Sequence, residues 1–247
     1  MTFLKWESLL EKHIEGFFNK KFASDLQLVE IEKYLEREMQ LQKKRQAQQY
    51  YIPNQYSLYM GAEDYQRLCP LSVVEQLESV AMRLNIRLDC LIEDKLQILV
   101  KKDASLQKGS CRIVSSWENA TVAVDDAAAI ESRTIVLERP TFAKSLRLPE
   151  HKIAVLTVVS GADVEARLEL GEKKVHIGRR EKNEFLLTDI NASRLHACIA
   201  FEQYRHILYD GSSLNGTFVN GDKVDCRCLK YGDEIQIGNT ILRYEVM

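Results

Sequence analysis

The sequence predicts an α+β domain followed by an all-β sandwich, and three observations lead to this fold class. The chain has 247 residues, which is more than one ordinary core needs. Apolar residues recur at helical spacing in the first third, whereas the last third contains short strand-like runs. Eight of the eleven glycines lie at or after Gly161, so turn residues are concentrated there. We therefore expect domains at residues 1–117 and 151–247, joined by a linker at 118–150.

The N-terminal domain opens with two amphipathic helical patterns. The first has its large apolar residues at Phe3, Trp6, Leu10, Ile14, Phe17 and Phe18, and the second, after Ser24-Asp25, has Val29, Ile31, Tyr34, Leu35 and Met39. In the polar stretch at 40–49, we interpret basic residues 43–45 as a solvated helix end rather than a nucleic-acid patch, because no aromatic stacking series accompanies them. A strand-like run at 50–60, a helix at about 71–84 and two or three strands between 86 and 114 complete the domain.

Composition shifts between residues 118 and 150, where alanine, aspartate and two of the four prolines replace the periodic patterns. This change is typical of a linker, so we expect two domains that fold independently on a flexible tether open to proteases. The run at 133–139 could pair as a strand or serve as a short recognition motif.

The last third predicts a sandwich or barrel. From Ile153 onward, short runs of Val, Ile, Leu and Tyr alternate with turn sequences at 160–163, 170–172, 210–212 and 220–222. Within this region, Asn220-Gly221 predicts a two-residue hairpin that joins a strand at 217–219 to one at 223–224.

Composition and charge exclude several classes of protein. The formal net charge is −2 with both signs interspersed, which argues against a general nucleic-acid binder. No apolar run approaches the roughly 20 residues of a membrane-spanning helix, and the first residues lack a signal-peptide pattern, so we expect a cytoplasmic protein. Six scattered cysteines fit reduced thiols, and Cys226-x-Cys228 has no second pair nearby to complete a metal site. We expect no metal and no cofactor.

Catalytic motifs are missing from the sequence. It contains no Gly-x-Ser-x-Gly elbow, no His-Glu-x-x-His and no phosphate loop, and its five histidines are interpreted as surface or core imidazoles. We therefore expect no enzymatic activity. An enzyme in the N-terminal domain would need a polar cluster in a cleft, for which Glu63, Asp64 and Asp89 are candidates by residue type alone.

The most informative residues form an ordered set of short motifs in the last third. They are Gly178-Arg179, Ser193-Arg194-Leu195-His196, Ser213-Leu214-Asn215-Gly216-Thr217, Gly232-Asp233 and Ile237-Gly238. In this order and at these separations they resemble the forkhead-associated (FHA) domain, a β-sandwich that binds phosphothreonine peptides. The resemblance covers residues 153–247.

The same residues suit a phosphate by their chemistry. A phosphothreonine carries roughly −1.5 to −2 charges, so its reader needs forked cations and hydroxyl or amide donors on loops. Arg179, Ser193 and Arg194 supply such groups. The resemblance assigns Arg179 and Ser193 to the phosphate and Arg194 to the same pocket.

The remaining motif residues divide between ligand contact and support. The resemblance implies that Asn215 hydrogen-bonds the ligand backbone, although it could also be a plain turn residue before Gly216. Gly178 permits a sharp turn, and His196 is interpreted as a buried imidazole that ties the Ser193 loop to its neighbours. Leu214 stands where many family members have Thr or Ser, so we expect weaker binding in which Ser213 and backbone N–H groups compensate.

The first 115 residues have a second resemblance. Phe17-Phe18, Leu35-Glu36-Arg37-Glu38-Met39 and Pro53-Asn54-Gln55-Tyr56 are similar to the N-terminal domain of bacterial FhaA-type proteins. Resemblance to that family implies an adaptor that binds phosphothreonine and works with Ser/Thr kinases around cell-wall synthesis and division. It also implies recruitment to phosphorylated kinases or their substrates, which include membrane proteins. The alternative is a structural scaffold that uses a phosphate-independent FHA fold.

One threonine in the linker is a candidate phosphosite. Thr134 has Leu137 three positions on, and FHA domains commonly prefer an aliphatic or acidic residue at that place. Tethering raises the effective concentration of such a site, so phosphorylation would close the domain on its own linker or link two copies by self-association. The alternative interpretation is a β-prone stretch that packs on the domain surface.

Overall fold

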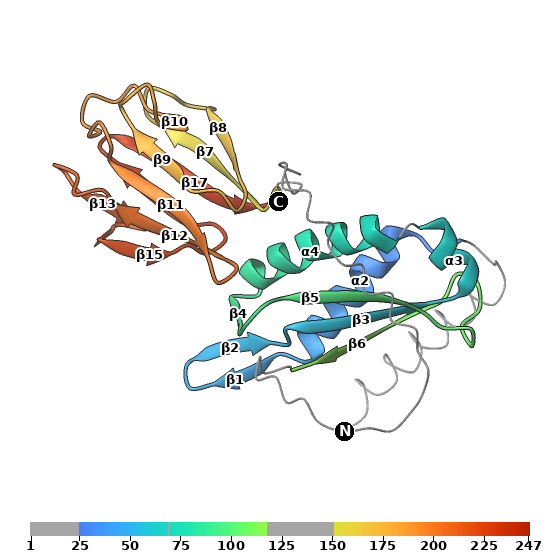
Figure 1. Ribbon diagram of the computed structural model, residues 1–247. Coiled ribbons are helices and arrows are strands. Elements are labelled where there is room, and N and C mark those ends of the chain that lie inside the picture. The colour runs from blue at the N-terminus through green and yellow to red at the C-terminus, as the bar shows by residue number, and fades with distance from the viewer. Residues whose placement is uncertain (1–24, 69, 118–150) are drawn as a thin grey trace, which may run out of the picture.

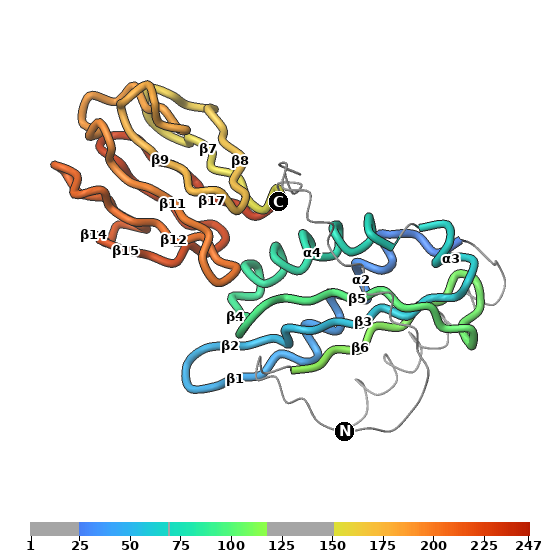
Figure 2. Tube along the Cα trace, viewed as in Figure 1, coloured from blue at the N-terminus to red at the C-terminus, as the bar shows by residue number. Residues whose placement is uncertain are grey.

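The computed structural model describes residues 25–68, 70–117 and 151–247, which form two packed parts (Figure 1). The N-terminal part combines helices with two small sheets, and the C-terminal part is a sandwich of two larger sheets. The expected order of an α+β domain followed by an all-β sandwich is confirmed. In the chain trace the C-terminal residue lies beside the N-terminal part (Figure 2), where Arg87 Nη2 donates to Met247 O at 3.1 Å.

Three helices belong to the described N-terminal part: α2 (Leu28–Leu41), α3 (Ala62–Arg67) and α4 (Pro70–Arg87). Helix α2 buries Ile31, Leu35 and Met39 at four-residue spacing. The predicted apolar face was too wide, because Val29 and Tyr34 lie off this stripe and are 54% and 37% exposed. The helical pattern predicted from Phe3 to Phe18 falls outside the described residues.

Two three-stranded sheets accompany these helices. One has the order β1 (Lys44–Gln46), β2 (Gln49–Ile52), β4 (Cys90–Ile92), and the other β5 (Gln97–Lys102), β3 (Gln55–Met60), β6 (Cys111–Ser116). Residues 44 and 45 are exposed to solvent as predicted, but the prediction that 43–45 end a helix is wrong. Residues 44–46 pair with β2, and Lys43 Nζ donates to Leu88 O at 2.7 Å and lies 4.0 Å from the centre of the Tyr50 ring.

The C-terminal sandwich has a six-stranded and a five-stranded sheet. The first runs β14 (Asp222–Val224), β13 (Thr217–Val219), β16 (Glu234–Ile237), β17 (Thr240–Val246), β7 (Ala154–Ser160), β8 (Arg167–Leu170). The second runs β10 (Phe185–Leu186), β9 (Val175–Gly178), β11 (Ala197–Glu202), β12 (Arg205–Asp210), β15 (Cys226–Cys228). The predicted hairpin at Asn220-Gly221 is confirmed: Val219 pairs with Asp222, and the two turn residues have φ of 54° and 89°, as a type I′ turn requires.

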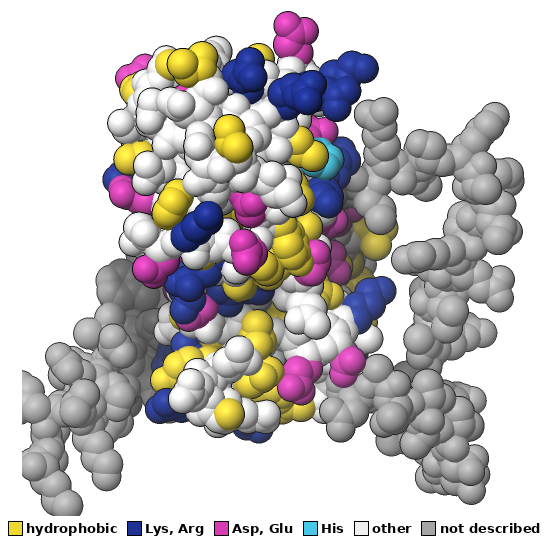
Figure 3. All heavy atoms as spheres, turned by 90° about the vertical axis from the view of Figure 1, so that its left-hand side faces the viewer, with side chains coloured by type: hydrophobic (Ala, Val, Ile, Leu, Met, Phe, Trp, Pro, Cys, Tyr) yellow, Lys and Arg dark blue, Asp and Glu magenta, His cyan; other side chains and the backbone are white. Residues whose placement is uncertain are grey.

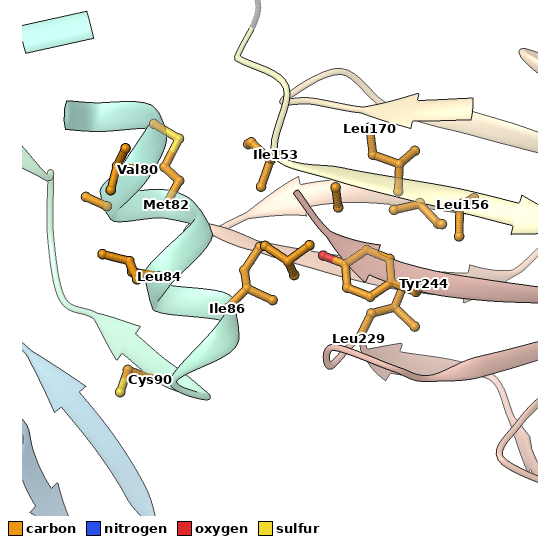
Figure 4. Packing of buried hydrophobic residues seen from close by; sticks show 14 of the residues in the cluster. Val80, Met82, Leu84, Ile86, Cys90, Ile153, Leu156, Leu170, Leu229 and Tyr244 are labelled. Atoms are coloured by element: carbon orange, nitrogen blue, oxygen red, sulfur yellow. The ribbon is translucent and has the colours of Figure 1, made fainter. Parts of the chain in front are cut away.

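The two parts share one hydrophobic core at a surface that we call the domain interface, formed by α4, the residues that follow it, and the nearby ends of β12 and β17. Ile86 at the end of α4 points toward Tyr244 of β17, beside Ile153 and Leu229 (Figure 4). All four side chains are at most 1% exposed. The expected arrangement of two domains held only by a tether is therefore corrected, because apolar surface is buried between them.

Polar contacts at the domain interface centre on Arg205, which is 3% exposed. Its guanidinium donates to Cys90 O and to Asp89 Oδ1, both at 2.9 Å, so it bridges the N-terminal part and the sandwich. Lys230 Nζ reaches the second oxygen of Asp89 at 2.7 Å. Burial alone would raise the pKa of Asp89, but these cations more than offset that effect and hold the pKa below its ordinary value.

Candidate functional site

Ten residues line an open cavity of about 890 Å³ at the end of the sandwich opposite the domain interface. We call it the loop-end cavity, and its lining is Arg179, Arg180, Ile190, Asn191, Ala192, Ser193, Arg194, Leu195, Leu214 and Asn215. Strand β12 connects the two ends, since it starts at Arg205 and finishes at Asp210, which anchors one of the cavity loops. Figure 3 shows Lys and Arg side chains gathered at the far end of the sandwich.

The backbone fixes the relative position of the arginine loop and the serine loop. Arg179 N donates to Ser193 O at 3.0 Å, and Arg180 N donates to Arg194 O at 3.1 Å. Gly178 makes this approach feasible: its φ is +150°, and a Cβ there would lie 2.6 Å from Ser193 O. Any other residue at 178 would push the two loops apart.

Ser193 and His196 form a second fixed element. The buried ring of His196 accepts from Ser193 N through Nδ1 at 3.0 Å and donates from Nε2 to Gly216 O at 3.2 Å. Burial lowers the pKa of His196 and so favours the neutral ring, and the bond from Ser193 N places its hydrogen on Nε2. The Ser193 hydroxyl oxygen accepts from Leu214 N at 3.1 Å, which leaves its hydrogen available to a ligand.

Asn215 is held at the rim of the cavity with its amide oriented. Its Nδ2 donates to Asn191 O at 2.8 Å, while its second amide hydrogen and its carbonyl oxygen have no partner among the described residues. Asn191 is itself positioned by the buried Asp189, whose Oδ1 accepts from Asn191 N at 2.8 Å. An oriented amide with one free donor and one free acceptor is suited to a peptide backbone.

Ser213 lies outside the cavity lining. Its Oγ donates to Asp210 Oδ1 at 2.6 Å, and Thr217 Oγ1 donates to the same oxygen at 2.6 Å. Burial would raise the pKa of Asp210, but the bonds from Ser213 and Thr217 more than offset it and leave the pKa below its ordinary value. This geometry gives Ser213 a structural role, and its predicted compensation for the hydroxyl missing at Leu214 is not supported.

The cavity carries a strong positive charge. Arg179, Arg180 and Arg194 are exposed, and no carboxylate lines the cavity. None of the three guanidiniums has an ion-pair partner within the described part of the chain. Three unneutralised cations on a water-exposed concave surface attract a multiply charged anion.

Sequence reasoning missed several lining residues, notably Arg180, Ile190 and Asn191. Arg180 could have been found as the neighbour of Arg179 in a double-arginine sequence. Ile190 and Leu214 are 83% and 90% exposed, so the lining also carries two large apolar side chains that are open to solvent.

The other candidate residues do not assemble into a site. Asp64 accepts from Gly109 N at 2.7 Å and Glu63 lies 3.9 Å from Lys108, whereas Asp89 belongs to the domain interface, so the three carboxylates do not share one site. Cys226 and Cys228 lie on β15, and no described cluster of His, Cys, Asp and Glu has metal-binding geometry. Thr134 falls outside the described residues. Among the described helices, none combines the length and apolar character that crossing a bilayer demands.

Comparison with known proteins identifies both parts. The FhaA N-terminal domain family matches residues 3–114, and the FHA domain family matches residues 175–238. The chain is 38% identical over 85 residues to the glycogen accumulation regulator GarA of Mycobacterium tuberculosis, covering 34% of this chain and 52% of that protein. It is 35% identical over 85 residues to the oxoglutarate dehydrogenase inhibitor of Corynebacterium glutamicum, covering 34% and 59% respectively. The chain thus spans about half the length of the curated relatives it matches.

Among solved structures, the chain is similar to the FhaA FHA domain that was crystallised with the intracellular domain of Rv3910. The identity is 30% and the TM-score 0.36, over 37% of this chain and 99% of that one. With an FhaA N-terminal domain followed by an FHA sandwich that carries Arg179, Ser193 and Asn215 on one cavity, the chain belongs to the FHA-domain proteins of the FhaA type.

Proposed function

We propose that this protein is a non-enzymatic adaptor that binds phosphothreonine-containing segments of partner proteins in Ser/Thr kinase signalling. The observation that carries the proposal is the lining of the loop-end cavity. Arg179, Ser193 and Arg194 place two guanidiniums and a free hydroxyl hydrogen on one concave surface, with no carboxylate to oppose an anion. A dianionic phosphate is the ligand group that best matches this set.

Each group has a defined task in this mechanism. Arg179 contacts two phosphate oxygens through its fork, Ser193 donates its hydroxyl hydrogen to a third, and Arg194 balances the remaining charge. Asn215 binds the backbone of the ligand next to the phosphothreonine through its free donor and acceptor. Gly178 and His196 keep the arginine and serine loops at the separation that this contact needs.

The partner in this proposal is a kinase or a kinase substrate on the cytoplasmic side, and the FhaA-type N-terminal domain directs the adaptor to cell-wall synthesis or division. Closure on phosphorylated Thr134, or self-association through it, remains a prediction from the sequence. The alternative function is a scaffold that ignores phosphate, and the exposed Ile190 and Leu214 favour it, because apolar contacts alone could hold a partner there.

A peptide titration decides between the two functions. The full chain should bind a synthetic phosphothreonine peptide and show at least about a hundredfold weaker binding to the same peptide without phosphate, since several charge-assisted bonds are lost. Equal affinity for the two peptides would establish the phosphate-independent scaffold and refute the adaptor that reads phosphothreonine.

A further inference from the structure

We propose that the loop-end cavity has a second anion subsite, centred on Arg180, so that its preferred ligand carries another negative group near the phosphothreonine. The inference rests on the proposed function, since it extends the ligand of the same cavity. This second group is negatively charged, and it can be either a second phosphate or a carboxylate.

The loop-end cavity carries more positive charge than one phosphothreonine balances. A single phosphothreonine carries roughly −1.5 to −2, which the guanidiniums of Arg179 and Arg194 neutralise. Arg180 is then a third cation in the same lining, exposed and without an ion-pair partner among residues 25–68, 70–117 and 151–247. One phosphothreonine therefore leaves about one positive charge of the lining unbalanced, and a second negative group on the ligand would neutralise it.

The backbone of Arg180 is fixed by hydrogen bonds and is not free to move away from the cavity. Its N–H donates to Arg194 O at 3.1 Å, and its carbonyl accepts from Asn183 N at 2.9 Å. Asn183 Nδ2 donates to Arg194 O at 2.8 Å and closes the loop onto the same anchor. These bonds hold the backbone of Arg180 at a constant distance from Arg194, so its side chain starts from a fixed point at the cavity.

The loop-end cavity also has room for more than one phosphate group. The cavity of about 890 Å³ extends from Arg180 across Ser193 to Leu214 and Asn215, so it is far larger than a phosphate group. A peptide with two separated anions would fill it, one anion at Arg179 and Ser193 and the other at Arg180.

Calorimetry measures the affinity of the full chain for three kinds of synthetic peptide, the second and third of which are series that vary the position of one residue. All have one phosphothreonine in a Gly-Ser-Ala host. The first has neutral flanks, the second places a glutamate at successive positions on either side, and the third places a second phosphothreonine at those positions. We expect the second anion at its best position to raise affinity about tenfold, with phosphate exceeding carboxylate.

Two variants locate the effect. Arg180→Ala should abolish the gain from the second anion and change affinity for the singly phosphorylated neutral peptide by less than about threefold. The control Lys182→Ala removes an exposed cation of the same loop that does not line the cavity, and it should preserve the gain. Both positions are exposed, so melting temperatures should stay at the wild-type value.

The outcomes separate the two proposals. No gain from a second anion at any position in the wild type, with normal binding of the singly phosphorylated peptide, overturns the subsite and leaves the proposed function standing. Equal weakening of all three peptides by Arg180→Ala also overturns it, because the residue would then contribute only general attraction. No binding of any phosphopeptide overturns both.

Discussion

The two ends of the FHA sandwich use arginine in opposite ways. At the domain interface, Arg205 is 3% exposed and both of its terminal nitrogens are paired. At the loop-end cavity, Arg179 is exposed and its guanidinium has no ion-pair partner among the described residues. The interface arginine contributes to holding the fold together, whereas the cavity arginine is unneutralised and available to a ligand.

This contrast places the residues that stabilise the fold and those that are available to a ligand at opposite ends of the sandwich. Changes at the Arg205 end of β12 should alter folding free energy without touching ligand affinity, and changes at the cavity should do the reverse. Distant sites without shared partners behave additively, so each end can be tested alone.

The largest effect should come from Arg179→Ala. Two charge-assisted hydrogen bonds, each worth roughly 1.5 to 3 kcal/mol, would be lost, so affinity for a phosphothreonine peptide should fall by about a hundredfold or more. The unfolding midpoint should not change, because the exposed side chain has no ion-pair partner in the described chain. Equal titration curves for the variant and the wild type would contradict the assignment.

Arg205→Ala should produce the opposite pattern. Removing the guanidinium leaves the carbonyl oxygen of Cys90 buried without its donor, so the free energy of unfolding should drop by about 2 to 4 kcal/mol. Phosphopeptide affinity should stay at the wild-type value. Denaturant titration measures the first quantity and calorimetry the second.

Two controls test this second prediction. Arg243→Ala breaks an exposed ion pair with Glu234, whose side chains are 45% and 46% exposed, and should cost less than about 1 kcal/mol. A fragment starting at His151 should keep phosphopeptide affinity but melt below the full chain, because Ile153 and Tyr244 lose their cover. A fragment as stable as the full chain would restore the picture of independent domains.

Lowering the pH should reduce the stability of the sandwich near the domain interface, because His206 is buried there in its neutral form. Burial lowers the pKa of this imidazole to about 4, while its ring bonds Tyr244 Oη at 2.8 Å and Gly171 O at 2.9 Å. Between the unfolded pKa near 6.5 and the folded value, the unfolded chain binds more protons, so stability falls as the pH falls. We expect a loss of about 2 kcal/mol by about pH 5. Denaturant titrations of wild type and His206→Gln at neutral pH and at about pH 5 should show a smaller loss of unfolding free energy in the variant. Identical losses would refute the role of His206 in the pH dependence.

Ser193→Ala should reduce phosphopeptide affinity by about tenfold or less, because only one neutral donor is removed. The residual binding should still depend on phosphate and weaken with added salt, since the arginines of the open cavity remain. Calorimetry at two salt concentrations measures both effects. A loss as large as that of Arg179→Ala would show that the loop itself had collapsed.

The smallest effect should come from Leu214→Thr. The side chain is 90% exposed, and a hydroxyl there would add a donor beside the phosphate and raise affinity by about threefold. If Leu214 instead contacts an apolar group of the partner protein, Leu214→Thr should weaken binding to that protein. Its affinity for a phosphothreonine peptide with neutral flanks should then stay unchanged. A competition titration distinguishes the two results.

The sequence by itself determined the features that depend on neighbours in the chain. The hairpin at Asn220-Gly221 follows from two residues that tolerate positive φ, and the α+β to sandwich order follows from the change of apolar period. Arg179, Ser193 and Asn215 were selected because their motifs resemble the FHA domain, and the structure brings all three onto the loop-end cavity.

Tertiary structure alone decided how residues far apart in the chain share surfaces. Arg205 and Arg179 are the same residue type near strand ends, yet one is buried because α4 and Asp89 pack on its end of the sandwich. The hydroxyl of Ser213 turned toward Asp210 instead of the cavity, and residues 44–46 became a strand because β2 offered them a partner. Each of these outcomes depends on which residue distant in the chain offers the better hydrogen bond or burial, and a local sequence pattern does not contain that information.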